Sequence, residues 1–270
     1  MNNKIIISVI AALLAGALGA QAQQWTVRGV TEPIKDATLG ATVAGIVASI
    51  NKQEGETVRQ GEVILELDKE QEALEVERRK LIAESKVEVT AAQYRVETIR
   101  LELDTARQLY ESTRSVPREE LQQKELEYKL AQAEVERLSI AEEREQLEYK
   151  IALEELRRRI ITAPFDGVII KQFLEVGEAC NPQAPLVRIA DISRCRLVIH
   201  MEASASRGLE PRVPVQIKID GVRSPAVLRG TVEYVSPVVD PSSGLREVKV
   251  LFDNPGGLIN PGLPATLLMK

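Results

Sequence analysis

Two stretches of this sequence decide its fold, because one repeats the other: ATVAGIVASINKQEGETVRQGEVILEL at residues 41–67 and APFDGVIIKQFLEVGEACNPQAPLVRI at residues 163–189. The copies align without a gap at a shift of 122 residues (163 − 41). Each copy predicts a strand, a glycine-containing turn and a second short strand, because β-branched residues favour strands and glycine admits positive φ. The turn glycines are Gly45, Gly55 and Gly61 in the first copy and Gly167 and Gly177 in the second. A unit of 27 residues can hardly bury a core alone, so we expect the copies to pack together as one pseudo-symmetric sandwich.

The segment between the copies, residues 69–159, contains no glycine and one proline, Pro117. Its apolar residues recur at the spacings of a heptad repeat. They are Val89, Ala92, Val96, Ile99, Leu103, Ala106 and Tyr110 in the first half, and Leu121, Tyr128, Ala131, Val135 and Leu138 in the second. This pattern predicts two antiparallel helices that form a coiled-coil hairpin inserted between the copies. Toward the base the pattern slips, with Arg78 and Ser85 on the seam, which predicts local unwinding or contact with a partner there.

The turn of the hairpin is predicted around residues 112–120. Pro117 suits the first turn of the second helix, and Ser115 is a candidate N-cap. Glu119 and Glu120 would lie near the positive end of the helix dipole. Arms of about 45 residues would reach roughly 65 Å at ~1.5 Å per residue. A projection of this length is a spacer, a docking device or, in the simplest interpretation, a dimerisation coiled coil.

The N-terminus has the features of a secretory signal peptide over residues 1–22. An apolar run at residues 5–18 precedes a small-x-small cleavage site at residues 20–22, so the mature chain is expected to begin at Gln23 and to be exported. An uncleaved N-terminal anchor is the alternative. The net charge of −5 and the pI near 5.3 indicate no basic surface for nucleic acid, so no nucleic-acid partner is expected.

The sequence contains few candidate catalytic, metal-binding or redox-active residues. Carboxylates lie on helix faces without an adjacent histidine, cysteine nucleophile or phosphate-binding glycine loop, so no enzymatic activity is expected. The adjacent His200 and Met201 would point to opposite faces of a strand, so no metal site is predicted, and no cofactor either. Cys180 and Cys195 allow a disulfide in an exported protein, or are two small buried side chains. Cys180 aligns with Val58 of the first copy, which favours a packing role.

The C-terminal part of the chain, from Arg196 onward, has short alternating apolar runs separated by turn residues. The runs lie at residues 197–199, 213–217, 232–235 and 248–252. Their regular spacing predicts a small antiparallel β-barrel, which an N-terminal strand around residues 25–30 could complete.

Both copies of the repeat resemble a known protein family. Residues 41–47 with 54–64 (EGETVRQGEVI) are similar to the biotinyl/lipoyl-like half-motif. Residues 163–169 (APFDGVI) with residues 176–178 are similar to its partner in the periplasmic adaptors, or HlyD-like membrane fusion proteins, of export pumps.

The resemblance implies a mixed α+β, elongated, multi-domain fold: a split lipoyl-like β-sandwich with an inserted antiparallel α-helical coiled-coil hairpin, plus a small C-terminal β-barrel. The expected domains are the signal peptide (1–22), an N-terminal strand joining the barrel (23–38), lipoyl-like half 1 (39–68), the hairpin (69–159), lipoyl-like half 2 (160–192) and the barrel (193–270). Many adaptors of resistance-nodulation-division pumps continue into a membrane-proximal domain, whereas this sequence ends at Lys270. Docking on the pump is therefore expected to use the barrel and lipoyl-like units, or to involve another type of pump.

In this family the hairpin tip meets the outer-membrane duct through an arginine, an apolar residue and a serine before the second helix. The matching region carries the candidate docking residues Arg107, Tyr110, Arg114, Val116, Pro117 and Arg118. Pro117 stands where the family has its serine, and the spacing of the arginine also departs from the family, so the tip motif is degenerate.

By this resemblance the chain is expected to be a non-catalytic adaptor in the periplasm that links an inner-membrane transporter, of the resistance-nodulation-division or ABC type, to an outer-membrane efflux duct. The family also implies a homo-oligomeric ring, hexameric by resemblance. Two alternatives stay open: a structural coiled-coil protein of the envelope without a transport partner, and a lipoyl or biotinyl carrier subunit modified at Lys69. The sequence leaves the cargo and the transporter class open.

Overall fold

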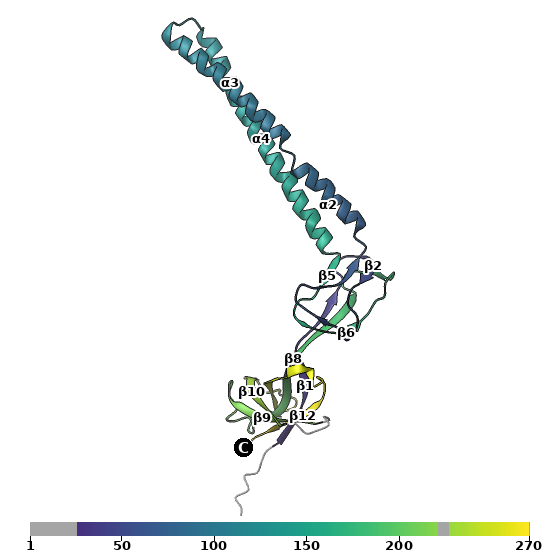
Figure 1. The fold of residues 1–270 in the computed structure, drawn as a ribbon. Helices are drawn as coiled ribbons and strands as arrows, with labels where there is room; N and C mark the ends of the chain where they lie inside the picture. Colours follow the sequence, from purple (N-terminus) through teal and green to yellow (C-terminus); the bar gives the residue numbers. More distant parts are fainter. Residues whose placement is uncertain (1–25, 221–226, 270) are drawn as a thin grey trace, which may run out of the picture. The chain divides into compact units, whose positions relative to one another are not determined.

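The computed structural model describes residues 26–220 and 227–269. The predicted signal peptide therefore lies outside the described residues. The chain divides into two compact units, which we call the barrel unit (residues up to Ala37 and from Ile189 onward) and the hairpin unit (Thr38–Arg188) (Figure 1). No helix in the described part of the chain is long and apolar enough to cross a membrane.

The barrel unit contains, within the described residues, a closed sheet in the order β1-β12-β9-β10-β11-β8, and pairing of β1 with β8 closes it. The strands are β1 (Thr26–Gly40), β8 (Pro185–Glu202), β9 (Pro214–Ile219), β10 (Val227–Val235), β11 (Leu245–Asp253) and β12 (Pro264–Leu268). The N-terminal strand completes the barrel, as the sequence predicts: Thr26 lies opposite Leu268, and Val30 lies opposite Pro264.

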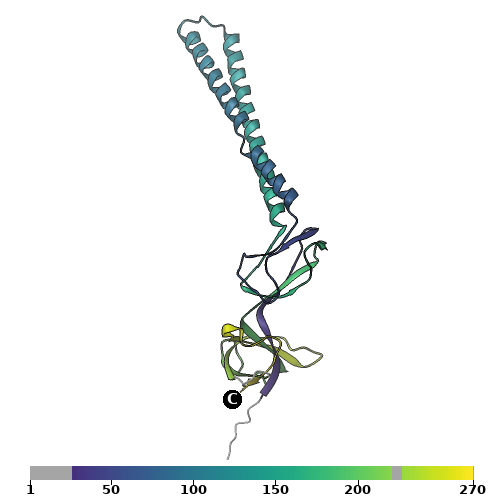
Figure 2. The same cartoon turned by 45° about the vertical axis from the view of Figure 1, so that its right-hand side comes forward.

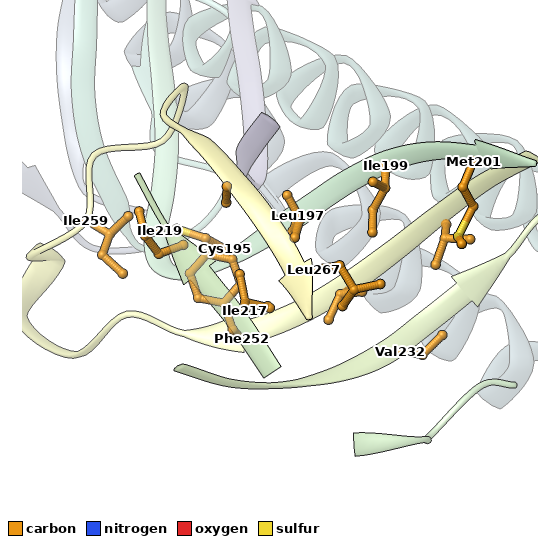
Figure 3. Packing of buried hydrophobic residues seen from close by; sticks show 13 residues of the cluster. Cys195, Leu197, Ile199, Met201, Ile217, Ile219, Val232, Phe252, Ile259 and Leu267 are labelled. Atoms are coloured by element: carbon orange, nitrogen blue, oxygen red, sulfur yellow. The ribbon is translucent and has the colours of Figure 1, made fainter. Parts of the chain in front are cut away.

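The barrel core follows from the alternation of side chains along its strands. On β8, Cys195, Leu197, Ile199 and Met201 are buried, whereas His200 is exposed. The β8 residues pack with Ile217, Ile219, Val232, Phe252, Ile259 and Leu267 (Figure 3). Because successive side chains of a strand point to opposite faces, His200 and Met201 are separated, as the sequence predicts.

Asn254 fixes the chain after β11, where the short 3-10 helix η2 (Pro255–Gly257) begins. Its buried amide nitrogen donates hydrogen bonds to the carbonyls of Ile192 and Ile259, both at 2.9 Å. Its amide oxygen accepts the backbone N–H of Ile259, also at 2.9 Å. Both polar groups of this buried side chain are therefore satisfied, which lets Asn254 hold the segment around Ile259 against the core.

Both cysteines are free, buried thiols. Cys195 belongs to the barrel core, and burial raises the pKa of its thiol. Cys180 belongs to a separate core in the hairpin unit, where it packs with Val47, Leu65 and Leu186. The disulfide that the spacing allowed is therefore wrong for this structure, because each cysteine is packed within its own hydrophobic cluster. The alternative interpretation, two small buried side chains, describes both residues.

In the sandwich of the hairpin unit, each copy of the repeat completes the sheet of the other. The strands are β2 (Gly45–Ile50), β3 (Thr57–Val58), β4 (Val63–Leu67), β5 (Ile160–Thr162), β6 (Gly167–Gln172) and β7 (Ala179–Cys180). Strand β2 of the first copy pairs with β7 of the second, and β3 pairs with β6. Hydrogen bonds repeat in the same way: the Gly55 N–H donates to the Ile169 carbonyl at 2.9 Å, and the Gly177 N–H to the Val47 carbonyl at 2.8 Å. The predicted pseudo-symmetric packing of the copies is confirmed.

The hairpin consists of α2 (Glu70–Ala83), α3 (Val87–Ser112) and the long α4 (Arg118–Arg157) (Figures 1 and 2). Every apolar residue assigned to the seam from the sequence is buried or half-buried, and Ile99 and Leu103 are the most enclosed. The first arm is interrupted at residues 84–86, between α2 and α3. This break includes Ser85, which the sequence placed on the slipped seam, so the predicted local unwinding is confirmed there.

At one position both copies have a left-handed backbone, but only the first copy has a glycine there. Gly61 of the first copy has a φ of 81°, and its equivalent in the second copy, Gln183, has a φ of 71°. Both donate their backbone N–H across the pseudo-symmetric pair, Gly61 to Ala163 and Gln183 to Ala41. Only glycine adopts this left-handed conformation without steric strain, so Gln183 carries strain that Gly61 does not.

The substitution Gln183→Gly is expected to raise the free energy of unfolding of the hairpin unit by about 1 kcal/mol, because it removes this strain. Gly61→Gln is the matched control and is expected to lower it by a similar amount, since the side chain has open space and meets only the backbone constraint. Urea unfolding followed by circular dichroism measures both effects. A less stable Gln183→Gly protein would contradict the assignment of strain.

Candidate docking surfaces

The two ends of the hairpin are held together at its root. Strand β4 pairs with β5, which places Glu66 opposite Ile160. Arg159 adds three further contacts: its carbonyl accepts the Leu67 N–H at 2.8 Å, and its guanidinium donates to the Asp68 carbonyl at 3.0 Å and to the Glu72 carboxylate. This arrangement ties the entry and exit of the hairpin to the sandwich.

Lys69 stands at this root as the N-cap residue of α2. Its ammonium lies 2.6 Å from a carboxylate oxygen of Glu66. A lipoyl or biotinyl carrier needs its lysine at the exposed tip of a tight turn, but here that turn is replaced by the hairpin. The position of Lys69 therefore disfavours the carrier interpretation.

Ion pairs hold the basal helix α2 against α4. Arg79 donates to Glu75 on its own helix at 2.9 Å and lies 3.7 Å from both Glu145 and Glu148 of α4. Hydrogen bonds from Arg78 and Arg79 lower the pKa of Glu75 to about 2. These groups are partly solvated, so they orient the helices more than they stabilise them.

The predicted tip residues lie in two different settings. Arg107 is engaged across the hairpin with Glu125 of α4 at 3.0 Å, and Tyr110 is half-buried near the end of the seam. Arg114, Val116 and Pro117 lie in the loop between α3 and α4, and Arg118 begins α4. Within this loop Val116 is half-buried, whereas its neighbours are exposed.

The expected capping by Ser115 is wrong. Pro117, with φ −62° and ψ 149°, is the N-cap residue of α4, and no side chain caps this helix. The Ser115 hydroxyl instead lies 2.6 Å from the Thr113 hydroxyl. A residue that precedes proline is disfavoured from helical backbone, so Val116 cannot begin the helix directly after Ser115, and the serine is used inside the loop. Glu119 and Glu120 occupy the first turn, as the sequence predicts.

A second surface was missed by the sequence interpretation. In the second copy Ile170, Phe173 and Val176 are exposed by 45%, 37% and 59%. The equivalent positions of the first copy, 122 residues earlier, hold Ala48, Asn51 and Glu54. We call Ile170, Phe173 and Val176 the second-copy face. The signal in the sequence is the set of positions at which the aligned copies differ in polarity, and these positions identify the second-copy face.

A hollow of about 670 Å³ lies beside Phe173 and Val176 of this face. Both copies line it, the second through Gln172, Phe173 and Val176 and the first through Ile50, Gln53 and Glu54. The Gln172 side-chain nitrogen is buried and has no hydrogen-bond partner among the described residues. Lys171 places its ammonium 5.3 Å from the centre of the Phe173 ring. Exposed apolar groups next to an unsatisfied donor are typical of a surface that another molecule covers.

Comparison with known proteins identifies the group to which the fold belongs. A family model described as a CzcB-like barrel-sandwich hybrid domain matches residues 35–191, more than half of the chain. An uncharacterized protein of Haemophilus influenzae is 27% identical over 89% of this chain and 56% of its own length. The cobalt-zinc-cadmium resistance protein CzcB of Cupriavidus metallidurans is 24% identical over 86% of this chain and 42% of its own length. The chain thus spans about half the length of these curated relatives.

The solved structure of MacA from Actinobacillus actinomycetemcomitans has the same fold, with a TM-score of 0.71 at 18% identity, over 92% of this chain and 78% of that one. The barrel, the split sandwich and the inserted hairpin agree with the fold expected from the sequence. The chain belongs to the periplasmic adaptor, or membrane fusion, protein family of efflux systems, with a CzcB-like barrel-sandwich hybrid domain.

Proposed function

We propose that this protein is a non-catalytic adaptor that links an inner-membrane transporter to an outer-membrane efflux duct from the periplasm. The observation that carries the proposal is the hairpin rooted in the sandwich, where Arg159 ties both of its ends to β4 and α2. A coiled coil fixed at one end presents its other end at a constant distance from the sandwich. The tip is therefore suited to docking, and the energy for transport comes from the transporter.

We assign the second-copy face to contacts between copies of this chain. A ring requires head-to-tail contacts between two different surfaces, and a sandwich with two identical halves would offer the same surface twice. The replacement of Ala48, Asn51 and Glu54 by Ile170, Phe173 and Val176 breaks this equivalence. This difference between the surfaces of the two copies supports the homo-oligomeric ring that the family resemblance implies.

The double substitution Phe173→Asn and Val176→Glu restores the polar character of the first copy at the second-copy face. Because both side chains are exposed, the fold is expected to stay intact, while self-association weakens at least tenfold. Sedimentation velocity over a range of concentrations measures the association, and circular dichroism checks the fold. Asn51→Ala, at the position equivalent to Phe173, is the control and should associate normally. Unchanged association of the double variant would remove this face from the interface.

Docking at the tip can be tested with a photo-crosslinking amino acid at Val116 in living cells. An outer-membrane duct protein is expected to be captured there, because Val116 is the half-buried apolar residue of the tip loop. Leu130, exposed by 62% on α4 away from the loop, is the control position and should not capture it. If neither position captures a duct although the protein is exported normally, the chain is a structural coiled-coil protein of the envelope.

The role of Arg107 needs a charge swap, because its guanidinium pairs with Glu125. Exchange of the two residues (Arg107→Glu with Glu125→Arg) keeps the ion pair and hence the hairpin. Loss of the Val116 crosslink in this variant assigns Arg107 to docking. Retention of the crosslink limits Arg107 to holding α3 against α4.

The cargo class we propose is divalent transition-metal cations. The CzcB-like family model and the relative named for cobalt, zinc and cadmium resistance support this choice. A strain that lacks this chain is expected to accumulate cobalt, zinc or cadmium and to grow poorly on their salts, with unchanged growth on a hydrophobic antibiotic. The opposite pattern of sensitivity would contradict a metal cargo while leaving the adaptor role in place.

A further inference from the structure

A hollow of about 600 Å³ in the barrel unit belongs to neither candidate docking surface. It is lined by residues 207–209, by the beginning of β9 with the residue before it (213–216), by Arg229 of β10, and by Leu268 and Met269 at the end of β12. Its volume lies within the range of about 300–1,000 Å³ that is usual for small-molecule sites.

The floor of the hollow is apolar. Leu209, Val213, Val215 and Met269 pack against the barrel core from this side. All four remain only half-buried, so each keeps part of its apolar surface open toward the hollow. An apolar group that entered would cover this surface, which is favourable at about 25 cal/mol per Å² removed from water.

The rim of the hollow is cationic. Arg207 and Arg229 are both exposed, and neither guanidinium group has a hydrogen-bond or ion-pair partner among the described residues. The described lining residues include no aspartate or glutamate; the remaining polar side chain is Gln216. Most other arginines discussed above, such as Arg79, Arg107 and Arg159, have carboxylate partners. Two unpartnered guanidinium groups are well suited to one carboxylate or phosphate, which accepts paired hydrogen bonds from arginine.

We propose that this hollow binds an amphiphilic anion: a single acyl chain on the apolar floor, with its acidic headgroup between Arg207 and Arg229. An inorganic anion would use the arginines but leave the floor exposed. An uncharged or cationic chain would cover the floor but leave both guanidinium groups unpaired. Only a ligand with both properties satisfies the whole lining. The proposal does not depend on transport or on the tip.

Sodium decanoate, below its micellar concentration, is a suitable probe for the purified full-length mature protein. The sequence contains three methionines, and Met1 falls in the predicted signal peptide. Met269 lines the hollow, whereas Met201 is buried in the barrel core (Figure 3). With ¹³C-methyl-labelled methionine, decanoate is expected to shift the Met269 signal saturably and to leave the Met201 signal in place. Met269→Leu assigns the signal.

Calorimetric titration provides the second measurement. The pair Arg207→Gln and Arg229→Gln is expected to weaken decanoate binding at least tenfold, because the headgroup loses its charged hydrogen bonds. Arg194→Gln, at an exposed arginine of β8 outside the hollow, is the matched control and should bind normally. Decyltrimethylammonium and inorganic phosphate should each bind at least tenfold more weakly than decanoate.

Each other outcome overturns the proposal. Equal binding of phosphate would reduce the hollow to a simple anion site, and equal binding of decyltrimethylammonium would reduce it to a non-specific apolar surface. A shift of both methionine signals would indicate loosening of the barrel instead of occupancy. Absence of any shift would show that the hollow does not take an acyl chain.

Discussion

The pairing of β4 with β5 is the constraint on which the hairpin unit depends. It joins the last strand before the hairpin to the first strand after it, so the helices must leave and return at the same point. The exchange of β3 and β7 between the copies then makes the two halves inseparable, because each supplies backbone partners that the other lacks. A long insertion between the copies is tolerated because its two ends are already held together by the sandwich.

Much of this architecture could be read from the sequence because the signals are periodic. The shift between copies predicts the strands closely: β2 and β6, and likewise β3 and β7, occupy equivalent positions. The heptad pattern predicts burial correctly at every residue assigned to the seam. Each helix of a two-helix hairpin buries one face, and the apolar heptad positions mark that face. The slip at Ser85 marked the break between α2 and α3 because a polar residue on the seam removes the packing that sustains the helix there.

What the sequence did not predict depends on contacts between distant residues. The sequence predicts that the N-terminal strand joins the barrel, but not that it pairs with both β12 and β8. Which copy completes which sheet is likewise a long-range pairing that no local pattern encodes. Ser115 satisfies the usual preference for an N-cap, but the loop placed Pro117 there instead. The second-copy face and the positive φ of Gln183 appear only when the two copies are compared in space, because each is a departure from the symmetry that made the repeat visible.

The heptad seam of α3 and α4 has an evolutionary consequence. Because the packing repeats every seven residues, deletion or duplication of one heptad in each arm shortens or lengthens the hairpin by about 10 Å without changing the face it buries. Neither the root at Arg159 nor the loop around Val116 takes part in such a change. The length of the hairpin can therefore change in steps of one heptad while the sequences at both of its ends stay the same.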